Sequence, residues 1–300
     1  MAPTAQSMTH IPTLSVIVAA HNARVSVAEC LAVLDAQCGE GRAEIIVVDN
    51  STDGTTAIIR EQFPHLKLVT TSPPALIPEL WAIGIQPSHS DIVAITTAHC
   101  IPDRAWLGHI CLAHAACVPA VGGAIEKDES ATGVDWAIYF CRYSQYMLPF
   151  ARRFVPEIAG DNASYKRFFL DRCREVWQHG FWEPNVHAEL RQTGYQLLLD
   201  PAIVVRHKRS FHFSAFVQQR FRHGLRFGQW RTSRLSMGKR TVYLLCAPIV
   251  PLVLLVRIGR QVLAKRRHRR RFVLVSPLLV LFLIAWAVGE VAGSLRGTES

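Results

Sequence analysis

Hydrophobic positions along the first 120 residues follow two different periods. Continuous apolar runs of strand length alternate with segments in which apolar side chains recur at helical spacing. The runs predict strands at 14–20, 44–49, 67–70 and 91–97, and the intervening segments predict helices at about 25–37, from near Asp53, at 76–86 and near 103–117. Alternating strands and helices predict an α/β fold with a mostly parallel sheet covered on both faces.

Beyond residue 120 the pattern is less regular. The segment 121–126 predicts one more strand, 127–157 is polar and aromatic, and 160–167 is typical of a loop that enters a helix. Two apolar runs follow, 15 residues at 242–256 and 18 residues at 272–289. Because a helix needs about 20 apolar residues to cross a bilayer, the second run is a candidate span. The first contains two prolines, and we interpret it as re-entrant or interfacial.

Charge is unevenly distributed. Residues 1–200 carry 14 Lys and Arg against 21 Asp and Glu, whereas residues 201–289 carry 18 Lys and Arg and no acidic residue. Such a block predicts a surface that faces phosphates. It flanks apolar runs rather than aromatic side chains on a sheet, so we expect membrane lipids and no nucleic acid as partners. Within it, residues 213–235 have the composition of an amphipathic basic helix at a lipid surface.

The cysteines and the first residues indicate the compartment. The eight cysteines form no CxxC pair and no zinc-like spacing, which favours free, reduced thiols. Residues 1–12, which we expect to be disordered, show neither a basic n-region nor an apolar h-region. We therefore expect the main part of the chain to face the cytoplasm at the inner membrane. No GxGxxG follows the first strand, which argues against a flavin or nicotinamide enzyme.

Three of the predicted strands end at the sheet edge where α/β folds bind ligands. These strand ends are Ala20-His21-Asn22, Asp49-Asn50-Ser51 and Thr97-Ala98-His99. The Asp49 carboxylate can accept hydrogen bonds from a uracil N–H or a ribose hydroxyl. The alternative is an Asx turn or a helix cap, because the residues that follow form a capping sequence. We favour a nucleotide contact for Asp49 and a capping role for Asp53.

The order of these stretches resembles a known family. "SVIVAAHN", "IIVVDNSTDGT" and "IPDRAWL" are followed by "GDNASYKR", "FWEPNVHAELRQTGYQLLLDPAIVVRHK" and "QQRFRHG", as in glycosyltransferase family 2. The resemblance covers about residues 13–235 and implies the GT-A fold, in which a Rossmann-like sheet joins an acceptor-binding half. It implies a nucleotide-binding half at 13–120, an acceptor half at 121–212 and the amphipathic segment at 213–235, before membrane helices at 236–300.

The resemblance also implies an activity. It is inverting transfer of a sugar from a nucleotide-sugar, which we expect to be a UDP-sugar, to a lipid-linked or polysaccharide acceptor of the cell envelope. The implied donor-binding residues are Ala20, His21, Asn22, Asp49, Thr97, His99 and Arg222. A second hypothesis, from another class, is a degenerate, non-catalytic partner protein with the same fold.

That second hypothesis comes from a departure at the metal motif. The family usually places two aspartates where Thr97 and His99 stand, and these hold Mg²⁺ or Mn²⁺ against the leaving diphosphate. His99 together with His207 is one alternative ligand set, better suited to Mn²⁺ than to Mg²⁺. In the other alternative, Arg220, Arg222 and His223 neutralise the diphosphate. The departure puts the divalent cation in question.

The resemblance places the catalytic base at Glu183, the only acid between Glu175 and Glu189. Pro184 replaces the family's second acid, so Glu183 would act alone. The alternative is a helix N-terminal charge ahead of that proline. By the same resemblance, Asp161 and Asn162, in the acceptor-side segment, would help to position the acceptor and the donor sugar. We expect Trp182 to offer a ring face to a sugar and Trp136 to lie in the core.

Overall fold

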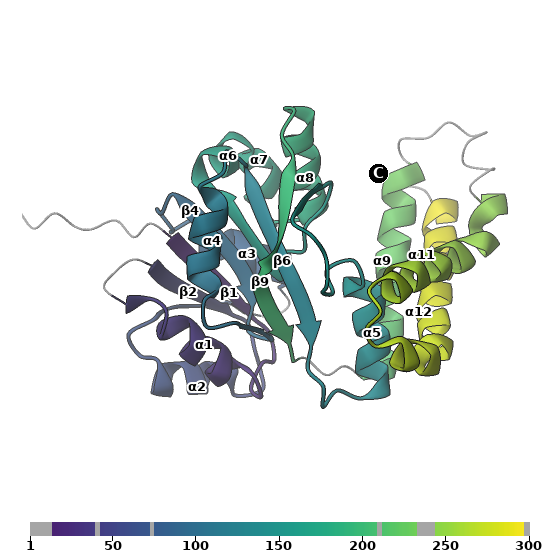
Figure 1. The fold of residues 1–300 in the computed structure, drawn as a ribbon, viewed down its shortest axis with the longest axis horizontal. Helices are drawn as coiled ribbons and strands as arrows, with labels where there is room; N and C mark the ends of the chain where they lie inside the picture. Colours follow the sequence, from purple (N-terminus) through teal and green to yellow (C-terminus); the bar gives the residue numbers. More distant parts are fainter. Residues whose placement is uncertain (1–13, 40–42, 73–74, 209–211, 233–243, 297–300) are drawn as a thin grey trace, which may run out of the picture. The chain divides into compact units, whose positions relative to one another are not determined.

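The computed structural model describes residues 14–39, 43–72, 75–208, 212–232 and 244–296 (Figure 1). The chain forms two compact units, one from residues 1–126 and 148–209 and the other from residues 127–147 and 210–300. This division differs from the expected one. The amphipathic segment and residues 127–147 of the expected acceptor half belong to the second, helical unit. The disorder predicted for 1–12 lies outside the described residues.

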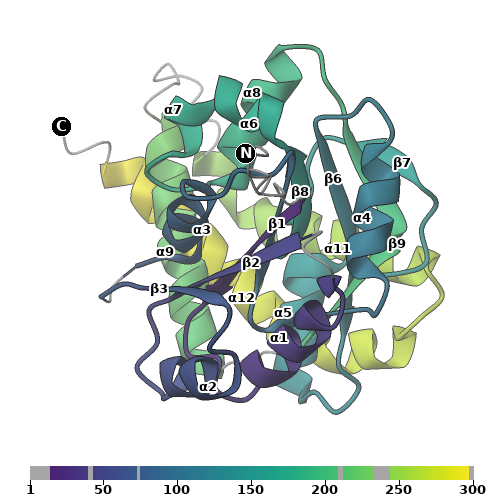
Figure 2. The same cartoon turned by 90° about the vertical axis from the view of Figure 1, so that its left-hand side faces the viewer.

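A mixed sheet forms the centre of the first unit (Figure 2). Its order is β3-β2-β1-β4-β8-β6-β9-β5, and β7 pairs with β9. The described strands are β1 Leu14–Ala20, β2 Ala43–Asp49, β3 Lys67–Thr70, β4 Ile92–Thr97, β5 Cys100–Pro102, β6 Ala120–Lys127, β7 Arg153–Val155, β8 Asn162–Lys166 and β9 Leu197–His207. The first four strands are parallel and lie where the sequence predicts them.

Helices cover both faces of this sheet. Side chains of β1 point to both faces, and all of them are therefore buried. The helices of the first unit are α1 Val27–Asp35, α2 Thr55–Gln62, α3 Ile77–Ile85, α4 Trp106–His114, α6 Arg167–Arg172, α7 Arg174–Trp177 and α8 Glu183–Gln192. On α3, a Cβ at Gly84 would lie 2.3 Å from Cγ2 of Ile17. Glycine therefore lets α3 pack directly on β1.

The second half of the sheet corrects the sequence prediction. The stretch 160–167, expected as a loop, contains β8, which pairs antiparallel with β4 and β6. Strands β5 and β7 pair antiparallel with β9. Because β8 contains polar residues, its sequence shows no apolar run that would predict a strand. Asn162 and Ser164 are buried, and each donates a hydrogen bond to a backbone carbonyl of a neighbouring strand.

The second unit is helical. It contains α5 Gly133–Tyr143, α9 Phe213–Thr232, the short 3₁₀ helix η2 Ala247–Ile249, α11 Val250–Ala264 and α12 Arg269–Arg296. Helix α5 was missed, although Thr132 and Asp135 form the capping box that marks its start. Two segments of the second unit, Leu244–Ala264 and Arg269–Leu295, are long and apolar enough to cross a membrane.

Helices α9 and α12 pack backbone against backbone. A Cβ at Gly224 would lie 2.1 Å from the Trp286 carbonyl oxygen, and one at Gly228 would lie 2.2 Å from that of Glu290. From the first contact to the second, the residue numbers rise by four in both helices, so the two helices run parallel. The ring of Phe216, on the apolar face of α9, packs 4.7 Å from that of Phe282. Much of the face predicted to meet lipid is therefore covered by α12.

Candidate functional site

The loops that follow β1 and β2 are hydrogen-bonded to each other. The Asn22 N–H donates to Ser51 Oγ at 2.8 Å, and the Thr52 N–H donates to Asn22 Oδ1 at 3.0 Å. His21 Nδ1 lies 2.8 Å from Asn50 Oδ1, so this nitrogen carries the proton that it donates. Asn22 has a φ of 51°, in the left-handed region that asparagine tolerates. The structure thus joins the predicted donor-binding residues of two strands into one rigid edge.

Asp49 lies at this edge with a buried side chain. Its Oδ1 accepts hydrogen bonds from Ser51 N at 3.0 Å and Ser51 Oγ at 2.5 Å, and its Oδ2 accepts one from Thr56 Oγ1. This is the Asx turn that the sequence offered as the alternative. The carboxylate organises the loop, and its contact with a nucleotide stays a prediction.

Asp53 does not cap α2 in the predicted way. The N-cap is Gly54, with a φ of 91°, and Asp53 precedes it. Its carboxylate still accepts hydrogen bonds from Thr55 N and Arg24 N, each at 3.1 Å. Partial burial raises the pKa of Asp53, but these hydrogen bonds and that from the Thr55 hydroxyl outweigh it and hold the pKa below the usual value.

Both ring nitrogens of His99 are occupied. Nε2 lies 3.2 Å from the carbonyl oxygen of His21, so it must donate, and Nδ1 lies 3.2 Å from Ser26 Oγ. The ring is buried and links the end of β4 to the loop after β1. Metal ligation by His99 would require one of these hydrogen bonds to break.

Thr97, at the other position of the metal motif, contacts a carboxylate. Its hydroxyl lies 3.3 Å from Asp161 Oδ1, and the neighbouring Thr96 hydroxyl donates to the Asp161 carbonyl at 2.9 Å. Asp161 is buried and precedes β8, which is the strand that pairs with β4. An acid from a distant part of the sequence therefore stands beside the motif that lacks its aspartates.

The part of the chain that the structure describes contains no group of three or more His, Cys, Asp or Glu that could hold a metal ion. His207 pairs in register with Cys100, and Lys208 N donates to the His99 carbonyl at 2.8 Å, so the backbones of the two predicted ligands are adjacent. The donors that do meet here are the Asp161 carboxylate and the Thr97 hydroxyl. Two hard oxygens fit an ion completed by substrate phosphates better than a resident protein-bound ion.

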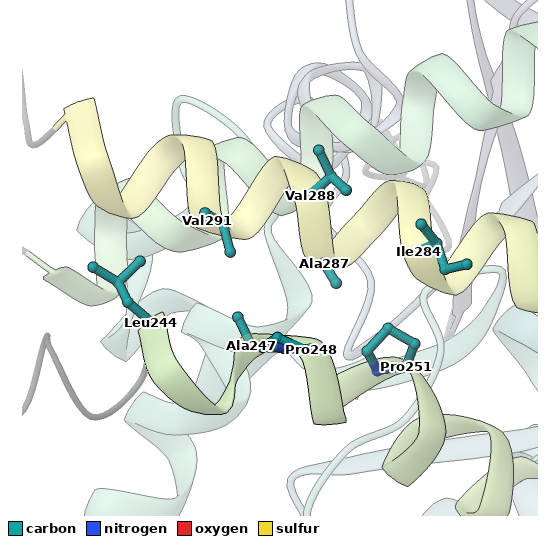
Figure 3. Close-up of a pocket in the computed structure, with 8 residues that line it drawn as sticks. All are labelled: Leu244, Ala247, Pro248, Pro251, Ile284, Ala287, Val288 and Val291. Carbon is teal, nitrogen blue, oxygen red and sulfur yellow. The ribbon is translucent and has the colours of Figure 1, made fainter.

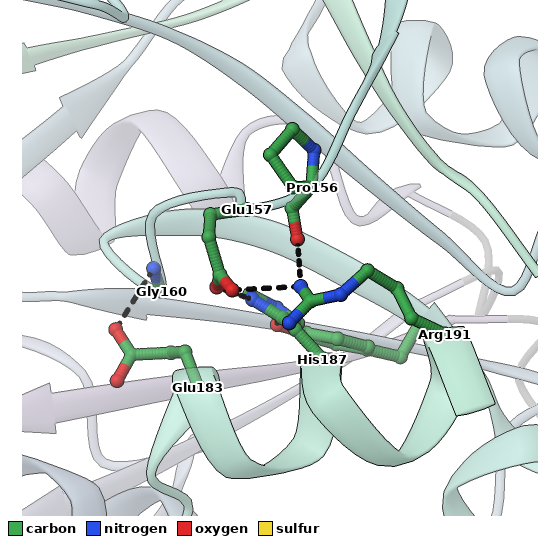
Figure 4. A network of polar contacts seen from close by, with 7 residues as sticks. Pro156, Glu157, Gly160, Glu183, His187 and Arg191 are labelled. Atoms are coloured by element: carbon green, nitrogen blue, oxygen red, sulfur yellow. Dashed lines mark hydrogen bonds and ion pairs between the residues drawn. The ribbon is translucent and has the colours of Figure 1, made fainter. Parts of the chain in front are cut away.

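Glu183 is the first residue of α8, and its carboxylate is half-buried. Its Oε1 accepts a hydrogen bond from Gly160 N at 3.1 Å (Figure 4). A Cβ at Gly160 would lie 2.6 Å from that oxygen and 2.6 Å from the Trp81 ring. The indole of Trp81 in turn donates to the Thr96 carbonyl at 2.7 Å. Gly160 thus brings Glu183 close to Asp161 and to the end of β4.

A second polar network fixes α8 itself (Figure 4). The buried His187 ring contacts the Tyr165 hydroxyl at 2.9 Å and Glu157 Oε2 at 2.5 Å. Arg191, one turn further along α8, donates to Glu157 Oε1 at 2.7 Å and to the Pro156 carbonyl. The helix that carries Glu183 is therefore attached to β8 and to the loop before Gly160.

The remaining predicted residues have different places. Asn162 donates to the Ala124 and Ile203 carbonyls and accepts from the Trp106 indole, so we assign it a structural role in place of an acceptor contact. Trp182 is 38% exposed, as a ring face for a sugar requires. Trp136 is buried, but in the second unit. Arg222 is an exposed residue of α9, also in the second unit, and its donor contact stays a prediction.

Sequence reasoning missed Trp81, His187 and Glu157. The signal for His187 was its position four residues after Glu183, on the same face of a predicted helix. Nothing local points to Trp81 or Glu157, because their partners are distant in the sequence.

A family model described as glycosyl transferase family 2 matches residues 15–174. The chain belongs to glycosyl transferase family 2. It is therefore a glycosyltransferase, and the resemblance noted from its motifs is confirmed. A comparison with curated proteins gives no match.

One solved structure agrees with the fold expected for this family, and a second is similar to a lower degree. A mannosyltransferase from Pyrobaculum calidifontis, solved with GDP-Man and Mn²⁺, is 19% identical, with a TM-score of 0.57 over 94% of this chain and 88% of that chain. Residues 1–349 of TarS from S. aureus, solved with UDP-GlcNAc, are 11% identical, with a TM-score of 0.48 over 96% and 93%. The similarity to the mannosyltransferase structure confirms the predicted GT-A fold of this glycosyltransferase.

Proposed function

We propose that this family 2 enzyme inverts the anomeric centre of a UDP-sugar and transfers the sugar to a lipid-linked or polysaccharide acceptor at the cytoplasmic face of the inner membrane. The observation that carries the proposal is the position of Glu183. Through Gly160 its carboxylate lies next to Asp161 and the end of β4, at the ligand-binding edge of the sheet.

Inverting transfer needs one base. The acceptor oxygen attacks the anomeric carbon on the face opposite the diphosphate, and the bond from that carbon to the diphosphate oxygen breaks. The acceptor proton passes to a Glu183 carboxylate oxygen within hydrogen-bond reach. As the first residue of α8, Glu183 lies at the positive end of the helix dipole, which favours the ionised carboxylate that a base must be.

The two joined loops would hold the rest of the donor. His21, Asn22 and Asp49 belong to one hydrogen-bonded edge that would lie beside the nucleoside, and the exposed ring of Trp182 would stack on a sugar face. Preformed hydrogen bonds reduce the cost of ordering these loops when the donor binds.

A divalent cation is compatible with this site. The mannosyltransferase was solved with GDP-Man and Mn²⁺, which supports a test for the same ion in this chain. Asp161 and Thr97 would hold such an ion together with diphosphate oxygens, and the ion would supply positive charge to the leaving group.

The test is calorimetric binding of a nucleotide-sugar panel, with GDP-Man among UDP-sugars, in Mn²⁺ and in EDTA. We expect a UDP-sugar to bind most tightly. Preference for GDP-Man would overturn the donor assignment. If no nucleotide-sugar binds in Mn²⁺ and none binds in EDTA, the degenerate partner protein is favoured.

A further inference from the structure

Helix α5 holds the basic turn between α11 and α12, all within the second unit. Lys265 Nζ donates hydrogen bonds to the carbonyl oxygens of Ser144 at 2.9 Å and Gln145 at 3.0 Å, and to that of Met147. These carbonyls follow the last residue of α5, where a helix dipole attracts a cation. One charged side chain thus attaches the turn to the end of α5.

Aromatic packing strengthens this attachment. The Trp136 ring lies 4.7 Å from that of His268, and the Arg271 guanidinium lies 4.6 Å over the same indole. One turn further along α5, Phe140 meets Phe272 edge-on at 5.4 Å. The turn and the start of α12 are therefore packed on α5 by several independent contacts.

Helix α5 must lie on the same side of a bilayer as the first unit. The segment that contains it, residues 127–147, is an insertion whose two ends continue into the first unit at Glu126 and Leu148. Crossing a bilayer and returning would take two spans of about 20 residues each. The insertion is too short, so the basic turn that α5 holds also faces the side of the first unit.

The middle and C-terminal half of α12 are constrained by α9. The rings of Phe213 and Phe216 contact that of Phe282, which follows Arg269 by 13 residues. At 1.5 Å per residue this is about 20 Å along α12. Were α12 upright in a bilayer, the exposed Arg222 and Arg226 of α9 would lie in or beyond the far half of the hydrocarbon core. Each arginine at the centre would cost about 3 kcal/mol.

We propose that α11 and α12 form a hairpin that lies in a single leaflet, on the side of the first unit, with its basic turn on anionic lipid headgroups. Val273 and Leu274 are 65% and 77% exposed and lie within one helical turn of the exposed Arg270. Basic residues next to exposed apolar ones are what an anionic leaflet binds. The proposal concerns attachment and holds whatever sugar the enzyme transfers.

The cavity between the two helices fits this arrangement. It has a volume of about 400 Å³ and only apolar side chains line it, with Pro248 and Pro251 of α11 and its preceding turn facing Ile284 and Ala287 of α12 (Figure 3). In a single leaflet the acyl chain of a lipid would fill it. The whole segment Leu244–Ala264 is long enough to cross, but its exposed Arg257 and Arg260 limit the part without charges to about residues 244–256, roughly 20 Å against the ~30 Å hydrocarbon core.

The experiment is side-specific labelling with a membrane-impermeant maleimide, in intact spheroplasts and in inverted inner-membrane vesicles of an expression host. The full-length variants Arg270→Cys and Leu295→Cys report the turn and the end of α12, both exposed. Native Cys111, exposed on α4, reports the side of the first unit in the same molecule. Peptide mapping by mass spectrometry separates the labelled cysteines.

We expect Cys111 and both introduced cysteines to be labelled from the same face. Labelling of position 270 from the opposite face would show two ordinary spans and would overturn the proposal, as would labelling that needs detergent. Position 295 on the opposite face would show that α12 crosses, with the same consequence. None of these outcomes depends on transferase activity, so the proposed function stands or fails separately.

Discussion

At the scale of single residues, Gly160 determines where Glu183, the proposed base, lies. A methyl group there would meet the Glu183 carboxylate and the Trp81 ring at 2.6 Å, so one of them must move. We expect Gly160→Ala to lower the transfer rate by about 10²-fold, because a displacement of about 1 Å has that effect on a reacting group.

The control for this substitution is Gly108→Ala. Gly108 lies on α4 with nothing within 4 Å of its added Cβ, so its transfer rate should stay at that of the parent enzyme. Steady-state rates of both variants check the prediction. Equal rates for the two would mean that the contact between Gly160 and Glu183 is irrelevant to catalysis.

His114 gives the first unit a pH-dependent stability. Burial lowers the pKa of His114 from 6.5 to about 4, with Lys166 adding to the effect. Its Nε2 lies 2.8 Å from Ser164 Oγ. The ring is neutral in the folded chain, whereas the unfolded chain takes up a proton below about pH 6.5. Protonation of His114 in the unfolded chain therefore does not affect the free energy of unfolding above pH 6.5. As the pH falls from 6.5 to about 4, the free energy of unfolding decreases.

The loss corresponds to about 3 kcal/mol in the free energy of unfolding, at 1.36 kcal/mol per pKa unit. His114→Gln keeps a polar group toward Ser164 but cannot be protonated. We expect its melting temperature to fall less between pH 7 and pH 4 than that of the parent. Parallel pH profiles of the two proteins would contradict this account.

At the scale of elements, α8 depends on its attachment through His187. Replacing this buried ring by alanine leaves the Tyr165 hydroxyl and the Glu157 carboxylate without it. We expect His187→Ala to lower the free energy of unfolding by about 1–3 kcal/mol, the cost of losing the two hydrogen bonds of a buried side chain. Denaturant titration measures this, with the exposed His179 changed to alanine as the control. A His187 variant as stable as the His179 variant would remove the network from the account.

The elements also show what the sequence could predict. β1, β2 and β4 are largely buried apolar runs with clear ends, and their ends place His21, Asn22, Asp49 and Thr97 together. β8 was missed because the hydrogen bonds that satisfy its polar side chains come from strands distant in the sequence. The pairing of Asp161 with Thr97, and of Glu183 with Gly160, follows from that antiparallel strand, and the local pattern does not reveal it.

At the scale of the whole molecule, the chain combines a GT-A sheet with a helical unit that has two segments long and apolar enough to cross a membrane. The sequence placed the basic and apolar runs correctly. It did not show that residues 127–147 belong with them, because this depends on tertiary contacts of Lys265 and Trp136.

The most direct test of the account is transfer by the full-length enzyme in its membrane with Glu183→Gln. The glutamine keeps shape and polarity but cannot take up the acceptor proton. The matched control is Glu175→Gln, on the exposed surface of α7. The donor is the nucleotide-sugar that binds most tightly in the calorimetric panel, and a membrane lipid extract supplies the acceptor. The rate is measured as release of the nucleoside diphosphate. We predict a fall of about 10²–10⁴-fold with nearly unchanged donor affinity for Glu183→Gln, and parental values for Glu175→Gln. A Glu183→Gln enzyme that transfers at the parental rate would contradict the account.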